Sequence, residues 1–155
     1  TWDDWPEIAR NIFQLMRSEA GEEIVLEKNI FVERILFNDS EKGLSDEAKK
    51  EYIRPFKNAG EDRRPTLTWP RQIPIDGSPE AVIDEVTKNG EFHKNSDIPK
   101  LFINADPGTI LIGKQREFVR SWTNLKEVTV KGNHFVQEDS PHEIGEAIKV
   151  FIETI

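Results

Sequence analysis

The stretch VTVKGNHFVQEDSP, residues 128–141, decides how the rest of the chain is interpreted. Its first three residues alternate between apolar and polar and predict a short strand, and Lys-Gly-Asn at 131–133 predicts a turn. Asp-Ser-Pro at 139–141 predicts the beginning of a helix. This pattern places His134 on a loop just past the carboxyl end of a strand, the edge at which open α/β sheets bind ligands.

A loop histidine at this edge is suited to proton transfer. The ordinary pKa of histidine, about 6.5, lies near neutral pH, so His134 could act as a base. A histidine that only caps or packs its loop is the structural alternative, and sequence spacing does not separate the two roles.

The sequence on either side continues as alternating strands and helices. The predicted elements are a buried strand at 100–105, a turn at 106–108, a helix at 114–122, a strand at 127–130, and an amphipathic helix at 140–155 with Ile144, Ile148, Phe151 and Ile152 inward. Two strands joined through a helix should be parallel with a right-handed crossover. Parallel sheets usually have several strands covered on both faces, so we expect further sheet from another polypeptide, a swapped copy or another segment.

The residues before this region predict helices joined by polar turns. The predicted elements are a helix with Ile8, Ile12, Phe13 and Met16 on one face, a helix at 18–27, one after Ser45 that ends before Pro55, and one that begins at Ser78-Pro79-Glu80. Residues 30–36 are apolar and β-branched, and fit a strand or a short buried helix. The chain is thus predicted to divide into a helical region, 1–96, and a βαβα region, 97–155.

Composition narrows the range of functions. The 155 residues carry a net charge of −8, which argues against nucleic acid as a partner, and no apolar run is long enough for a membrane span. The absence of cysteine excludes disulfides and thiolate metal sites. His93, His134 and His142 show no tight spacing of the kind that binds metal, so no metal site is expected. We expect a cytoplasmic protein, with the periplasm as the alternative.

Acidic residues near His134 have two predicted roles. Asp106 follows the preceding strand and would share the sheet edge with His134, where a carboxylate can orient an imidazole as in catalytic triads. Glu138 and Asp139 are expected in the first turn of the next helix, where the helix dipole favours acidic side chains.

The longer stretch GNHFVQEDSPHEIGEAIKVFI, residues 132–152, resembles the histidine motif of the haloalkane dehalogenases, which have the α/β-hydrolase fold. Three more stretches resemble the same family in the same order: WDDWPEIARNIFQLMRSEAGEEIVLEKNIFVERIL, RRPTLTWPRQIPIDGSP and IPKLFINADPG. The similarity is to the hexachlorocyclohexane-degrading branch, with the coelenterazine luciferases of sea pansies as near relatives. It implies an α/β fold, namely the C-terminal half of an α/β-hydrolase, with a helical cap at 1–96 followed by a parallel βαβα unit at 97–155.

The resemblance also implies a reaction. Haloalkane dehalogenases cleave carbon–halogen bonds hydrolytically to an alcohol and a halide ion through an alkyl-enzyme ester, and His134 would activate the water. No organic cofactor or metal is needed. The family's nucleophile elbow, halide-binding residues and usual acid have no counterpart in this sequence. The implied partners are therefore a small apolar halogenated substrate, a halide ion, and the N-terminal half of the fold as another chain or a swapped copy.

By the same resemblance, an apolar cavity for the substrate would be lined by Trp5, Phe13, Phe31, Ile35, Pro70, Ile73, Ile110 and Phe135. One branch of the family carries its acid after the strand that ends near Asp106, which makes Asp106 a possible acid. Residues 37–41 depart from the family at the mouth of the substrate tunnel. We expect the chain to be inactive alone. The alternatives are a coelenterazine-type luciferase, a monooxygenase on the same scaffold, or a catalytically inactive fragment or redesigned partner chain.

Overall fold

The computed structural model describes residues 1–155 and divides them into two compact units. One unit comprises Thr1–Asp39 and Gly43–Ile83, and the other comprises Ser40–Lys42 and Asp84–Ile155. The three residues Ser40–Lys42 thus belong with the sheet although they come from the helical part of the sequence. The division into a cap at 1–96 and a core at 97–155 stays a prediction. None of the helices combines the length and the hydropathy that a bilayer crossing requires.

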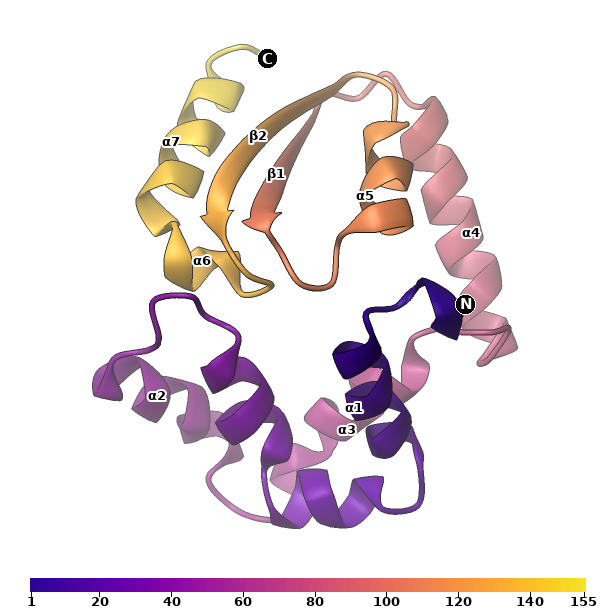
Figure 1. Ribbon diagram of the computed structural model, residues 1–155. Coiled ribbons are helices and arrows are strands. Elements are labelled where there is room, and N and C mark those ends of the chain that lie inside the picture. The colour runs from indigo at the N-terminus through magenta and orange to yellow at the C-terminus, as the bar shows by residue number, and fades with distance from the viewer. The chain divides into compact units, whose positions relative to one another are not determined.

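The first unit is helical apart from one isolated bridge between Ile75 and Ser78 (Figure 1). Its elements are η1 (Trp2–Asp4), α1 (Glu7–Arg17), the π-helical segments η2 (Glu22–Glu27) and η3 (Phe31–Leu36), α2 (Asp46–Ile53), η4 (Arg54–Phe56), η5 (Glu61–Arg63) and α3 (Arg64–Gln72). Residues 30–36, which fit strand or helix by pattern, are helical, as the family resemblance implies. The predicted helix at 18–27 is confirmed only for its second half.

A side chain explains where α2 begins. The Ser45 hydroxyl accepts a hydrogen bond from the Ala48 amide and caps α2 as predicted. In α1, Phe13 and Met16 of the predicted apolar face are buried, whereas Ile8 at its beginning is 77% exposed. Ile8 lies in the first turn of the helix, and the buried residues lie in its second half.

Two arginines hold the first unit together through main-chain oxygens. Buried Arg63 donates hydrogen bonds to the carbonyl oxygens of Leu26, Glu27, Phe56 and Lys57, which joins η2 to η4. Arg17 donates in the same way to the carbonyls of Pro70, Arg71, Ile73 and Ser78, at the end of α3 and in the segment that follows. A guanidinium has five N–H donors in a fixed planar geometry. It can therefore donate to several carbonyl oxygens that accept no hydrogen bond within a helix.

The second unit is built on two parallel strands, β1 (Lys100–Pro107) and β2 (Leu125–Gly132), in register at Ile103 and Val128. The helices are α4 (Glu80–Asn95), of which the unit holds the part from Asp84, α5 (Gly113–Arg120), α6 (Val136–Asp139) and α7 (Pro141–Ile152). Figure 1 shows α5 on one side of the strand pair, and α6 and α7 on the other. The βαβα pattern and the parallel pairing are confirmed. Both strands run two residues further than predicted, through residues expected in turns.

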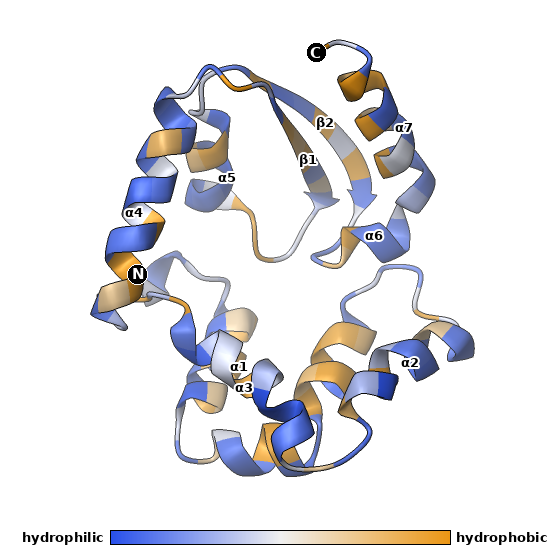
Figure 2. Ribbon diagram, turned by 180° about the vertical axis from the view of Figure 1, so that it is seen from behind, coloured by the Kyte–Doolittle hydropathy of each residue, from blue (hydrophilic) through white to orange (hydrophobic).

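The sheet unit has little apolar core of its own. Phe102 and Val130 are its buried apolar side chains, and no residue of α7 is fully buried. Ile148 and Ile152, predicted to point inward, are 43% and 61% exposed. Figure 2 shows the apolar stripe on α7 beside the apolar segments of the strands. The sheet has only two strands, so each keeps one edge without a strand partner.

Candidate active site

His134 lies at the carboxyl edge of the strand pair. β2 ends at Gly132, and His134 follows on an exposed loop, with its ring edge-on to Phe135 at a centroid distance of 5.0 Å. Asp106 is exposed near the end of β1, where its register partner is Lys131. The parallel register therefore brings Asp106 and His134 to one sheet edge, as the sequence predicts. Their roles as acid and base remain predictions.

The loop that carries His134 is fixed at both ends by side chains from its own sequence neighbourhood. The Asn133 amide donates to Asp139 Oδ2 over 3.0 Å, and the Ser140 hydroxyl donates to the Lys131 carbonyl over 2.6 Å. The short helix α6 closes the loop between these contacts. The loop that carries the imidazole is thus closed by two hydrogen bonds, from Asn133 to Asp139 and from Ser140 to Lys131, at the edge of the sheet.

Asp139 is a buried neighbour of the His134 loop whose position the sequence did not predict. Instead of standing in the first turn of α7, it ends α6 and is only 1% exposed. Its Oδ1 accepts hydrogen bonds from the Ser40 hydroxyl at 2.7 Å and the Lys42 amide at 3.1 Å, and the Lys42 ammonium donates to its carbonyl. These partners lie almost a hundred residues away in sequence, so no local pattern could have revealed them.

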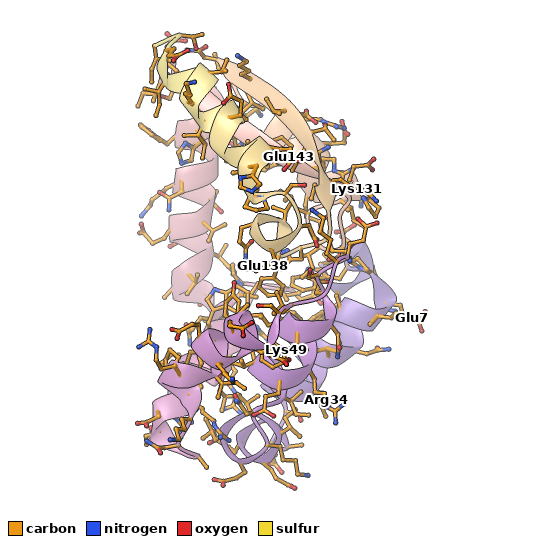
Figure 3. All side chains as sticks on the ribbon, turned by 90° about the vertical axis from the view of Figure 1, so that its left-hand side faces the viewer. Glu7, Arg34, Lys49, Lys131, Glu138 and Glu143 are labelled. Atoms are coloured by element: carbon orange, nitrogen blue, oxygen red, sulfur yellow. The ribbon has the colours of Figure 1, made fainter.

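The same contacts place Ser40 and Glu41, the last two residues of the segment 37–41 in which the sequence is expected to depart from the family. Ser40–Lys42 lies against α6 and the end of β2, and the Glu41 carboxylate pairs with the Lys131 ammonium at 3.0 Å. Lys131 and Glu138 are labelled in Figure 3. Ser40, Glu41 and Lys42 are therefore fixed beside the His134 loop.

Six of the eight predicted cavity-lining residues belong to the helical unit. Phe13 and Pro70 are buried, and Trp5, Phe31, Ile35 and Ile73 are half-buried. Rings of this unit form a continuous series, from Trp5 to Phe13 at 4.8 Å, from Phe13 to Trp69 at 6.0 Å, and from Trp69 to Phe31 at 6.0 Å. Aromatic rings at these separations provide a large apolar surface with defined geometry.

The remaining two, Ile110 and Phe135, belong to the sheet unit. Ile110 lies on the loop after β1 and Phe135 directly follows His134, and both side chains are half-buried. The structure thus places two predicted lining residues at the same sheet edge as the imidazole. Their contact with a substrate stays a prediction.

The three histidines lie on separate elements. His93 on α4 stacks on Trp122 at 4.8 Å, and His142 is in the first turn of α7. No group of three or more His, Asp or Glu side chains is arranged to hold a metal ion.

Known proteins show the relationship that this geometry suggests. No protein-family model matches the chain. A haloalkane dehalogenase of Mycolicibacterium smegmatis is 53% identical over 156 residues, which cover 99% of this chain. The chain is a homologue of the haloalkane dehalogenases. A second dehalogenase, from Sphingobium indicum, is 51% identical to this chain over 151 residues, which cover 97% of this chain.

Solved structures agree with this assignment. The haloalkane dehalogenase DbeA from Bradyrhizobium elkani superposes on 99% of this dehalogenase homologue with a TM-score of 0.92 at 33% identity. The fold is therefore part of an α/β-hydrolase fold. The chain spans about half the length of the curated relatives it matches, and 54% of DbeA.

The relatives also include a different activity. The coelenterazine h 2-monooxygenase of Renilla reniformis is 43% identical over the full length of this dehalogenase homologue. The two dehalogenases are more similar, at 53% and 51%, and DbeA is a dehalogenase as well.

Proposed function

We propose that the chain supplies the water-activating base and much of the apolar cavity of a haloalkane dehalogenase. The observation that carries the proposal is His134, exposed on a closed loop at the carboxyl edge of a parallel strand pair, in a chain 53% identical to a dehalogenase. The aromatic series from Trp5 to Phe31 supports an apolar substrate, because a halogenated hydrocarbon offers little to hydrogen-bond.

The proposed reaction has two steps. A carboxylate from the rest of the fold attacks an sp3 carbon and displaces halide, which forms an alkyl-enzyme ester. His134 then takes a proton from water and the resulting hydroxide attacks the ester carbonyl. The tetrahedral intermediate expels the alkoxide, which leaves as the alcohol with the proton of the new carboxyl group, so the carboxylate is restored. The imidazolium returns its proton to solvent. Asp106 is the candidate within this chain to stabilise the imidazolium, and a carboxylate elsewhere in the fold is the alternative.

The chain requires the other half of the fold for this reaction, as a separate polypeptide or a swapped copy. Two strands with unpaired edges, and apolar Ile148 and Ile152 at 43% and 61% exposure, support this part of the proposal. The nucleophile and the halide donors belong to that half, so the chain alone is inactive.

The test is halide release from a bromoalkane, measured for the chain alone and with the N-terminal half of the Sphingobium indicum relative as a second polypeptide. We expect turnover only with both. His134→Ala should release about one halide per complex and then stop, because the ester forms but is not hydrolysed. Mass spectrometry should detect the added alkyl group.

His142→Ala is the matched control, since His142 lies on α7 and should leave turnover unchanged. Turnover by the chain alone would contradict the need for a second half. Unaltered turnover by His134→Ala would contradict its role as the base.

The second candidate is oxidation of coelenterazine, which the 43% identity to the Renilla monooxygenase favours. Light emission by the same complex on addition of coelenterazine, without halide release from bromoalkanes, would select this reaction instead.

A further inference from the structure

One buried carboxylate connects three separate segments of the sheet unit. Asp139 Oδ2 accepts from the Asn133 amide, next to His134, and Oδ1 accepts from the Ser40 hydroxyl and the Lys42 amide. The two oxygens therefore face different segments, one the loop that carries the imidazole and the other a segment from the distant helical part of the sequence. Charge-assisted bonds of this kind are about twice as strong as neutral ones.

The end of β2 is shaped to let this carboxylate approach. Gly132 has a φ of +152°, and a Cβ built on it would lie 2.8 Å from both the Cβ and Oδ2 of Asp139. Only glycine accommodates this backbone conformation and this approach together. A side chain at position 132 would thus displace either the Asp139 carboxylate or the end of β2.

The carboxylate is held in its charged form. Burial raises the pKa of Asp139, but hydrogen bonds from the Asn133 amide, the Ser40 hydroxyl and the Lys42 and Glu41 amides outweigh it, and the pKa lies below its ordinary value. The Lys42 ammonium and the Glu41–Lys131 ion pair reinforce the same junction. Asp139 therefore remains an acceptor for both segments at neutral pH.

We propose that Asp139 is a positioning residue that orients His134, through Asn133 and Gly132, and couples this orientation to the segment Ser40–Lys42. Asp139 does not touch the reacting atoms. Its charge and burial fix where the His134 loop leaves β2. This inference goes beyond the proposed reaction. Its test does not measure turnover, so the positioning role and the proposed reaction can each fail without the other.

The test is NMR on the full 155-residue chain, with Asp139→Ala compared to Glu143→Gln, an exposed acid on α7 labelled in Figure 3. In Asp139→Ala we expect the Asn133 and Lys42 amides to exchange with solvent roughly tenfold to a hundredfold faster, the range for lost bonds to a charged group. The His134 ring signals should move towards those of a mobile histidine. Glu143→Gln should change neither.

The amides of β1 and β2 report whether the sheet itself survives. If they stay protected in Asp139→Ala while the His134 ring signals do not change, the positioning role is overturned and Asp139 merely holds the backbone. If the sheet is unprotected in the unaltered chain, both the structure and the proposal are overturned.

A second measurement covers the case in which Asp139→Ala does not fold. In the unaltered chain, the amide protons of Asn133 and Lys42 should titrate together, with one midpoint below the ordinary aspartate pKa of about 3.9. The His134 ring signals should respond at that same midpoint. Separate midpoints, or no response of His134, would contradict the coupling.

Discussion

At the residue scale, Gly132 should tolerate substitution poorly, and much less well than Gly145. A Cβ at Gly132 would collide with Asp139 and require an unfavourable φ, whereas a Cβ at Gly145 on α7 meets nothing within 4 Å. We expect Gly132→Ala to lower the free energy of unfolding by about 1–3 kcal/mol. Gly145→Ala should raise it by roughly 0.5–1 kcal/mol because alanine favours a helix interior. Urea unfolding of both variants measures this, and equal midpoints would contradict it.

Asp139 should also give the chain a specific acid sensitivity. Because its folded pKa is depressed, its stabilisation is fully present above the unfolded pKa of about 3.9 and is lost as the pH falls through the lower folded value. Other carboxylates with depressed pKa values, such as Glu22 and Glu127, contribute their own acid loss. We therefore compare how much the free energy of unfolding falls between pH 5 and pH 2 in each protein. The fall should be smaller for Asp139→Asn than for the unaltered chain. Parallel unfolding curves across this range would rule out the effect.

The same residues show how far sequence reasoning reaches at this scale. The position of His134 at a strand end could be predicted, because it follows from the local pattern of strand, turn and helix. The burial of Asp139 could not, because Ser40 and Lys42 lie 99 and 97 residues away and only the folded chain brings them to the carboxylate.

At the element scale, Arg63 should contribute strongly to the stability of the helical unit, because it links η2 to η4. Its guanidinium satisfies carbonyls of Leu26, Glu27, Phe56 and Lys57 in a buried place, and a lysine ammonium cannot match that fork. Arg63→Lys should destabilise the unit by about 2–4 kcal/mol, since it removes donors from part-buried carbonyls, although the Leu26 carbonyl keeps its bond from the Gly60 amide.

Arg54→Lys is the matched control for this prediction. Arg54 is exposed and pairs with Glu51 one helical turn away, an interaction worth little at a surface. Thermal unfolding of both variants should therefore shift for Arg63→Lys and hardly move for Arg54→Lys. Equal shifts in Tm would show that the carbonyl contacts of Arg63 stabilise the unit no more than the surface ion pair of Arg54 does.

Helix caps and hydrophobic periods predicted most elements. Ser45 caps α2, and both strands lie where alternation and β-branched residues indicate them. Residues 30–36 were undecided by pattern, because a short apolar run fits either period. The helix α6 was missed because its four residues are too few to show a period.

At the scale of the whole molecule, the sequence indicated that two strands need more sheet, and the structure has only two. The inward positions of Ile148 and Ile152 on α7 were wrong for this chain for the same reason. Periodicity identifies an apolar face, but it cannot say whether the surface that covers the face belongs to the same chain.

This distinction leads to a prediction about assembly. If the rest of a dehalogenase fold covers the apolar face of α7, a charge at Ile148 should weaken the complex with the N-terminal half. Since burying an isoleucine is worth about 1.5–3 kcal/mol, Ile148→Glu should raise the Kd roughly tenfold to a hundredfold. Lys149→Glu introduces the same side chain one residue along, at an exposed polar position, and should raise the Kd less than about threefold. Calorimetric titration of the two halves measures both. Equal Kd values for the two variants would show that α7 does not face the other half, and the exposed apolar stripe would then need another partner.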